Sequence, residues 1–135
     1  MGVGGFLLAL AFTTQATAQV IPTGTPAADI LLSQAIAEHR VFLTCSALDP
    51  AIHAQILTNW QRDTTAAAAI LAAQDVPDEA IAAFTAAAKP EALLPAPDTS
   101  FEDVRQLCDA NPDWQQRYFQ LNLTVLDLKL PGTFE

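Results

Sequence analysis

The stretch VRQLCDANPDWQQRYFQ, residues 104–120, holds one of the two cysteines of the chain and the boundary between two expected helices. Apolar residues before Cys108 recur at three- and four-residue spacing, which places this cysteine on the inner face of a helix. Asn111-Pro112 then gives a helix start signal, because an N-cap acceptor precedes a proline at the first helical position. Behind it, Trp114 and Tyr118 begin the apolar stripe of the next helix. The stretch therefore predicts two helices with a cysteine facing the core.

Cys45 and Cys108 lie far apart in the sequence, with no CxxC spacing. In an exported protein such a pair most simply forms a disulfide, whereas in the cytosol it would remain as two free thiols. The absence of closely spaced cysteines disfavours a redox-active or zinc-ribbon motif. Closing so long a loop would restrict the unfolded chain by about 4 kcal/mol. We expect a structural bridge that pins the last helices onto the first, with free thiols as the alternative.

The N-terminus has the pattern of an export signal. The apolar run GVGGFLLALAF at residues 2–12 is followed by Ala16-Thr17-Ala18, the small-x-small form that signal peptidase accepts. No Lys or Arg precedes the run, and the alternative is a retained helix too short to span about 30 Å of hydrocarbon. We expect a periplasmic or secreted protein without a membrane span after cleavage. The expected division is a secretory signal peptide at 1–18, a loose lead-in at 19–25 and a single helical domain at 26–135.

Prolines and acidic residues divide this domain into helices. Apolar residues at helical spacing predict helices over 26–44 and 50–73, the second started by Asp49-Pro50. A shorter helix is expected to follow the acidic stretch DVPDE at 75–79, where acids complement the helix dipole. Another is expected to begin at residues 99–102, where Thr and Glu have capping-box spacing.

The C-terminal stretch LNLTVLDLKL, residues 121–130, fits two patterns. It continues the helical stripe through Leu121, Val125 and Leu128, and it also alternates almost like a strand. We expect a helix, because no second strand is available to pair with it. The expected fold class is all-α: a small bundle of four to five mostly antiparallel helices with one disulfide.

Composition and charge narrow the function. Half of the residues are apolar, which is enough for a folded core and argues against disorder. Fifteen acidic residues oppose six basic ones, for a net charge of -9, and the basic residues are scattered singly. Nucleic acids and anionic membrane surfaces both require clustered Lys and Arg. We therefore expect a protein partner and no nucleic acid.

No motif in the sequence predicts an enzyme. There is no G-x-S-x-G elbow, no thiol beside a histidine and no H-E-x-x-H pair, and the only glycine-rich part lies in the export signal at residues 2–5. Adjacent carboxylates such as Asp78-Glu79 lie in expected first turns, where interaction with the helix dipole accounts for them. We expect no catalytic residue, no metal site and no cofactor.

The two histidines are candidates for a pH switch. His39 lies between Ile36 and Leu43 on an apolar stripe, and His53 lies on the apolar face of the next helix. In an antiparallel hairpin the two imidazoles could approach one another. One interpretation is a pair of partly buried neutral histidines with ordinary hydrogen bonds. The other is a switch, because protonating an imidazole on an apolar face destabilises the fold in acid.

The stretch KPEALLPAPD, residues 89–98, is rich in proline and cannot continue a helix. The simpler interpretation is an extended linker, which we prefer because no repeated P-x-x-P pattern is present. The alternative is a partner-binding segment in polyproline II form. Its contact residues would be Leu93, Leu94, Pro95 and Pro97.

Two functions of different class fit these expectations. The first is an exported, non-enzymatic interaction protein, an accessory subunit or adaptor. The alternative is an acid-responsive periplasmic chaperone that exposes apolar surface when its histidines are protonated. In outline the alternative is similar to the small periplasmic acid-stress chaperones, which are also exported, helical and linked by one disulfide. This chain is longer between Cys45 and Cys108 than they are, and it lacks their lysine-rich C-terminal composition.

Overall fold

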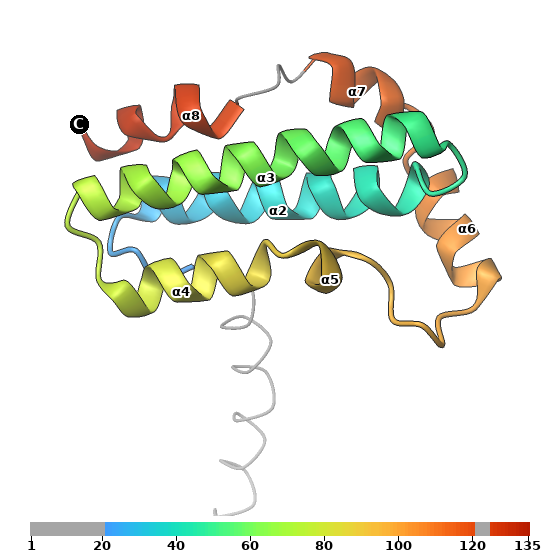
Figure 1. The fold of residues 1–135 in the computed structure, drawn as a ribbon, viewed down its shortest axis with the longest axis horizontal. Coiled ribbons are helices and arrows are strands. Elements are labelled where there is room, and N and C mark those ends of the chain that lie inside the picture. The colour runs from blue at the N-terminus through green and yellow to red at the C-terminus, as the bar shows by residue number, and fades with distance from the viewer. Residues whose placement is uncertain (1–20, 121–124) are drawn as a thin grey trace, which may run out of the picture.

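The structure, a computed structural model, describes residues 21–120 and 125–135. In these two ranges the chain is all-helical, with seven α-helices, one 3-10 turn and no strand (Figure 1). The expected fold class and its single disulfide are confirmed, and the expected count of four to five helices is too low. In chain order the elements are α2 (Pro26–Cys45), α3 (Pro50–Ala73), α4 (Asp78–Ala87), α5 (Pro90–Leu93), α6 (Phe101–Asp109), α7 (Trp114–Gln120), α8 (Val125–Lys129) and η1 (Pro131–Phe134).

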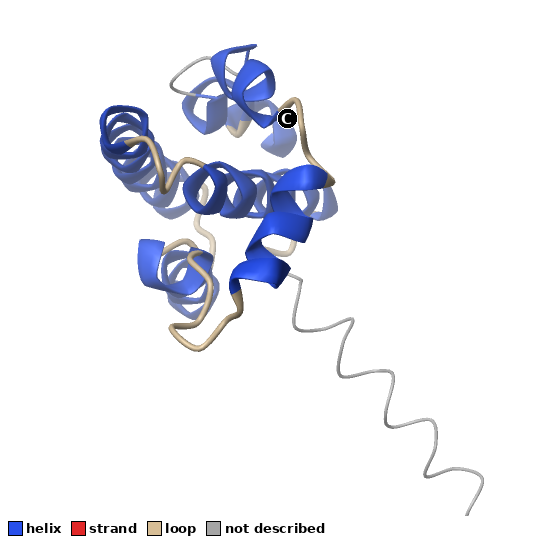
Figure 2. Ribbon diagram, turned by 90° about the vertical axis from the view of Figure 1, so that its right-hand side faces the viewer, coloured by secondary structure: helices blue, strands red, loops and turns tan. Residues whose placement is uncertain are grey.

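The long helices α2 and α3 form an antiparallel hairpin that is the middle layer of the domain. α7 and α8 cover one side of this hairpin, and α4 and α5 cover the other (Figures 1 and 2). Both long helices begin with proline, whose missing N–H would be unpaired there in any case. Asp49 caps α3, because its Oδ1 accepts a hydrogen bond from the Ile52 N–H at 3.4 Å. The expected bounds of both helices are therefore correct to within one residue.

The core lies between the layers and is built from the apolar faces of the hairpin. Trp60 of α3 is buried and its Nε1 donates a hydrogen bond to the Ala88 carbonyl at the end of α4, at 2.7 Å. An indole N–H left unpaired in the core would destabilise it, so this bond fixes the end of α4 against α3. The largest fully buried apolar side chains are Leu32, Phe42, Leu43, Ile56, Trp60, Leu71, Phe84, Leu93, Leu126 and Leu130.

The proline-rich stretch at 89–98 is not a plain extended linker. Its first part forms the short helix α5, because Pro90 occupies the N-terminal position where proline is tolerated. Arg40 of α2 donates a hydrogen bond from Nη1 to the Ala92 carbonyl at 3.1 Å, which ties α5 to the hairpin. Leu93 is fully buried in the core. The segment therefore contributes to folding as well as to connection.

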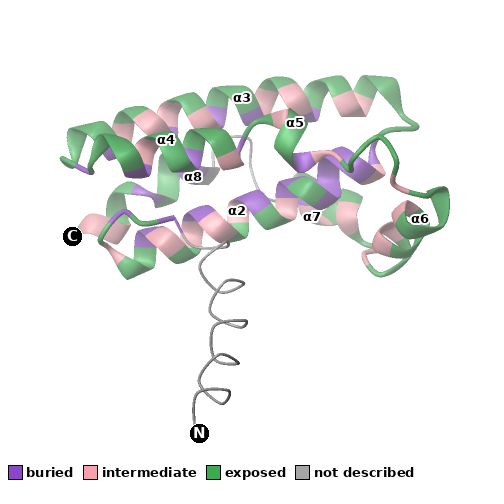
Figure 3. Ribbon diagram, turned by 90° about the horizontal axis from the view of Figure 1, so that it is seen from below, coloured by how far each residue is buried: buried purple, intermediate pink, exposed green. Residues whose placement is uncertain are grey.

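Helix α6 lies across the end of the bundle (Figure 2). Its N-cap is Ser100, whose Oγ accepts from the Asp103 N–H at 3.1 Å, one residue later than the expected Thr99–Glu102 box. None of its residues is buried, and Figure 3 shows no buried turn along it. The Cys45–Cys108 disulfide, with Cα atoms 5.7 Å apart, joins α6 covalently to the end of α2. The disulfide adds a covalent link to the packing of α6 against α2.

The expected last helix is two helices in the structure. α7 ends at Gln120 and α8 begins at Val125, and residues 121–124 lie outside the described residues. A single continuous helix would have turned Leu128 to the core, but Leu128 is exposed and its neighbours Leu126 and Leu130 are buried. The phase of the apolar stripe changes because α8 does not continue α7. The described part of the alternating stretch is helical, so the strand alternative is not seen there.

The export signal expected at residues 1–18 lies outside the described residues. The lead-in, expected to be loose, is packed where the structure describes it, since Ile21 and Thr23 are buried. Thr23 donates to Asp29 Oδ1 from its backbone N–H at 2.9 Å, which ties the lead-in to the first turn of α2. No helix in residues 21–120 and 125–135 is long and apolar enough to cross a membrane.

Candidate functional site

His39 is the most unusual side chain of the central hairpin. Only 5% of it is exposed. Its ring stacks on Trp60 of α3 with centroids 3.9 Å apart, and it meets Phe42 edge-on at 5.1 Å. Nδ1 lies 2.9 Å from the Ala35 carbonyl, so a proton on this nitrogen donates to the carbonyl oxygen. His39 is thus packed as a neutral aromatic residue of the core.

Burial lowers the pKa of His39 from 6.5 to about 4. The hydrogen bond to Ala35 and the negative charge of Glu38 oppose this effect, and both are weaker than the loss of solvation. The imidazole is therefore neutral at pH 7 and becomes charged only in acid. Protonation of His39 would place a positive charge among buried aromatic side chains.

His53 does not join His39. Its Nδ1 lies 2.9 Å from Ser46 Oγ near the turn of the hairpin, and its ring is half-buried. Ser46 follows the end of α2 and lies seven positions after His39, and His53 lies seven positions before Trp60 on α3. This places the two imidazoles about 10 Å apart along the hairpin. The expected meeting of the two histidines is wrong, and only His39 lies among aromatic core residues.

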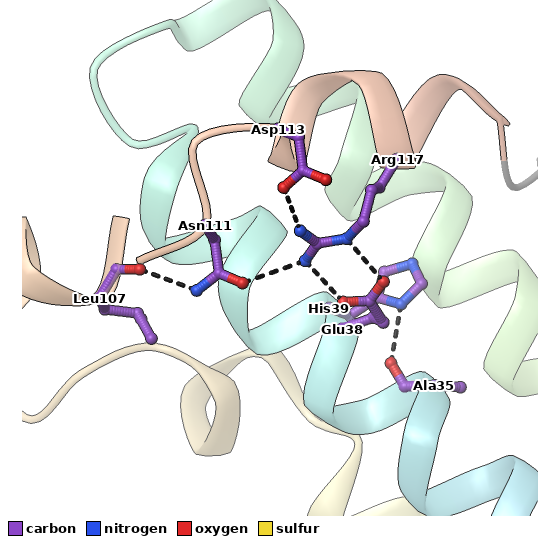
Figure 4. Close-up of polar contacts among 7 residues, drawn as sticks. All are labelled: Ala35, Glu38, His39, Leu107, Asn111, Asp113 and Arg117. Atoms are coloured by element: carbon purple, nitrogen blue, oxygen red, sulfur yellow. Dashed lines mark hydrogen bonds and ion pairs between the residues drawn. The ribbon is translucent and has the colours of Figure 1, made fainter. Parts of the chain in front are cut away.

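Beside His39, Arg117 ties α7 to α2 (Figure 4). Its Nε and Nη2 donate to the two oxygens of Glu38 at 3.1 and 2.8 Å, a bidentate pair between helices. Nη1 binds Asp113 at 2.6 Å, and Nη2 also donates to Asn111 Oδ1 at 3.3 Å. Asn111 in turn donates to the Leu107 carbonyl at 2.8 Å. The expected N-cap Asn111 is therefore a link between α6 and Arg117, and α7 begins only at Trp114.

Replacing Arg117 tests how much this junction contributes. We expect Arg117→Gln to lower the free energy of unfolding by about 1–2 kcal/mol, because a half-buried bidentate pair between helices is lost. Arg105 is the matched control, since it also binds two carboxylates but only within α6, and 51% of its side chain is exposed against 26% for Arg117. Arg105→Gln should change the same quantity by less than about 0.5 kcal/mol in urea titrations. Equal losses in the two variants would contradict a special role for Arg117.

The sequence pattern missed one functional carboxylate, Asp63. It is 2% exposed on α3, and its Oδ2 and Oδ1 accept hydrogen bonds from the N–H groups of Leu126 and Asp127 at 3.5 and 3.4 Å. Asp63 thus caps the N-terminus of α8 from another helix. Burial raises its pKa, although the two N–H groups act in the opposite direction. The sequence contained one indication that Asp63 is buried, because it lies three residues after Trp60 on the apolar stripe of the helix.

A cavity of about 440 Å³ lies between α2 and α8, next to His39. Its apolar walls are Leu31, Ala35 and Ala37 of α2 and Leu126 of α8. Its polar lining consists of Gln34, Glu38, His39 and Lys129. The volume is in the range of small-molecule sites.

The segment that was the alternative partner-binding site is only partly accessible. Leu93 is buried in the core and so is not available as a contact residue, Leu94 is half-buried, and Pro95 and Pro97 are exposed. The exposed large apolar side chain nearest to these prolines in the sequence is Phe101. It is the first residue of α6 and is 73% exposed.

Leu48, in the turn between α2 and α3, is 92% exposed. Like α6, this turn lies at the end of the bundle that carries the disulfide (Figure 1). Exposed large apolar side chains at one end of a small domain are typical of contact surfaces.

Within residues 21–120 and 125–135 no group of three or more His, Cys, Asp or Glu side chains is arranged to hold a metal ion. The fold and these contacts define a small all-helical domain linked by one disulfide. No protein-family model, no curated protein and no solved structure matches the chain.

Proposed function

We propose that this protein is an exported, non-enzymatic interaction protein, an accessory subunit or adaptor that works in the periplasm or outside the cell. A structural disulfide fits an oxidising compartment. The described helices, none of which could span a membrane, fit a domain that works outside the bilayer. The observation that carries the proposal is the exposure of Leu48 and Phe101, two large apolar side chains on segments at the same end of the bundle.

Of these two side chains, Phe101 is the aromatic one. It is 73% exposed and α6 buries none of its residues, so its ring contributes little to the core. Covering such a side chain would instead stabilise a complex, because aromatic residues dominate the energy of protein interfaces. Pro95 and Pro97 extend the same stretch of chain toward α5 and are already restricted in conformation. We place the protein contact on residues 95–101 and on Leu48.

Photocrosslinking in the native compartment tests this contact. A photoreactive phenylalanine analogue at position 101 should give one discrete adduct, identified by mass spectrometry. The same analogue at Gln55, an exposed position on α3, is the control and should give none. Phe101→Ser, which leaves the core intact, should abolish co-purification of the adduct's partner. No adduct at 101, or the same adducts at 101 and 55, would contradict the proposal.

The second candidate function is an acid-responsive chaperone, and His39 favours it. A buried imidazole stacked on Trp60 must acquire a charge in acid, which weakens the packing of α2 against α3. Opening at this position would expose the apolar faces of the central hairpin, which are the surfaces that an unfolded client could bind.

The charged groups around His39 do not remove this effect. On its own helix Glu38 raises the pKa of His39, but this effect is weaker than that of burial, and its carboxylate is paired with Arg117 of α7. α8 contributes Lys129, a further positive charge at the same cavity. α3 contributes Asp63, one turn beyond Trp60, whose carboxylate binds the N–H groups of α8. No unpaired carboxylate of the described chain is therefore placed to stabilise an imidazolium at this position.

A further inference from the structure

We propose that the cavity between α2 and α8 binds a small amphipathic carboxylate, with an apolar tail of medium length between the two helices and its carboxylate at Lys129. This is a small-molecule site, separate from the protein contact at Phe101. The volume of the cavity, the small side chains that line it and the positive charge at its rim support this assignment.

Small side chains create the space. Ala35 and Ala37 of α2 line the cavity where larger residues would fill it, and Leu31 and Leu126 provide an apolar wall on each side. The volume of about 440 Å³ suits a small organic molecule rather than a few water molecules. An apolar tail in this position would remove the exposed surface of Leu31 and Ala35 from water.

The charge at the rim selects the head group. Both oxygens of Glu38 accept hydrogen bonds from Arg117, so the carboxylate at the cavity already has a cationic partner. Lys129 forms no ion pair with any residue that the structure describes, although the protein as a whole is strongly acidic. The unbalanced group at the rim is therefore a cation. A carboxylate complements it, whereas an ammonium group would be repelled.

His39 closes the inner side of the cavity. It is neutral at pH 7 because burial lowers its pKa to about 4, so it adds no second positive charge there. An occupant with one anionic group and an otherwise apolar body matches this distribution. A phosphate or a second carboxylate would meet no further unpaired cation among the lining residues.

Isothermal titration calorimetry of the mature, disulfide-linked protein with octanoate, 1-octanol and octylammonium tests the proposal. These probes share a tail and differ only in head group. Octanoate should bind saturably with one site, octanol roughly fivefold more weakly, and octylammonium should not bind. Lys129→Gln should weaken octanoate about fivefold and leave octanol unchanged. Lys89→Gln, a lysine outside this cavity, is the matched control and should bind octanoate like the wild type.

A filling variant tests the location. Ala35→Leu should place a larger side chain in the cavity and abolish binding of octanoate and octanol, with its fold checked by circular dichroism. If that variant does not fold, Leu31→Phe serves the same purpose from the next turn of α2. Absence of saturable octanoate binding at millimolar concentration, equal binding of the three probes, or unchanged binding to Lys129→Gln would each overturn the proposal. Crosslinking from position 101 should be unaffected by octanoate, so failure here is distinguishable from failure of the proposed protein contact.

Discussion

Replacing both cysteines, as Cys45→Ser with Cys108→Ser, should lower the free energy of unfolding by about 4 kcal/mol. The bridge closes a loop between residues 63 apart, and breaking it returns that conformational freedom to the unfolded chain. A small domain is stable by about 5–15 kcal/mol in total, so this is a large fraction. Urea titration of the oxidised wild type and the double variant at pH 7 measures the difference.

Hydrogen exchange measured on the same variant should show which helix loses protection first. Because α6 buries no residue, its amides should lose protection from hydrogen exchange well before those of α2 and α3. Ser46→Ala is a control near the same end of α2, since it removes the two hydrogen bonds of the Ser46 hydroxyl and leaves the disulfide in place. Uniform loss of protection over all helices, or a loss below about 1 kcal/mol, would contradict the role assigned to the bridge.

His39→Phe should remove a large part of the sensitivity of the fold to mild acid. The pKa of His39 is lower in the folded state, about 4 against 6.5, so the unfolded chain binds the proton more readily. Its contribution to stability is therefore complete above pH 6.5 and is lost as the pH falls toward 4, by about 3 kcal/mol. Phenylalanine keeps a ring against Trp60 and cannot be protonated. Stability differences between pH 7 and pH 4, measured in urea, should shrink by about that amount in the variant.

His53→Gln is the matched control for this experiment, because the half-buried His53 lies outside the aromatic cluster. It should retain the acid sensitivity of the wild type. Binding of an apolar dye should rise between pH 7 and pH 4 in the wild type and in His53→Gln, and should rise much less in His39→Phe. Identical acid profiles for His39→Phe and the wild type would remove both the switch and the chaperone candidate.

Local patterns in the sequence were sufficient for the parts of the fold that depend on local physics. α2 and α3 have long apolar stripes and proline start signals, and their ends lie within one residue of the predicted positions. The Cys45–Cys108 bridge followed from counting cysteines in a chain that we expected to be exported. These features need no knowledge of which helix packs against which.

The errors concern residues whose position depends on distant contacts. The alternative of a partner-binding segment required an accessible Leu93, but Arg40 ties α5 to α2 and Leu93 lies in the core. Asp63 caps α8 across 63 residues of chain, a pairing that no local pattern contains. His39 was identified as a candidate, but its distance from His53 depends on how the two long helices pair. The spacing of residues within one helix does not determine this pairing.

α2 and α6 differ in how well they should tolerate substitutions. α2 lies against α3, α5, α6, α7, α8 and η1, so a change in its inward-facing residues disturbs several elements at once. α6 packs against α2 and is joined to it by the disulfide, but it buries none of its residues and leaves them exposed or half-buried. Replacements on α6 should be tolerated widely as long as Cys108 is kept. The disulfide thus allows the surface of α6 to vary in sequence while the folded core stays the same.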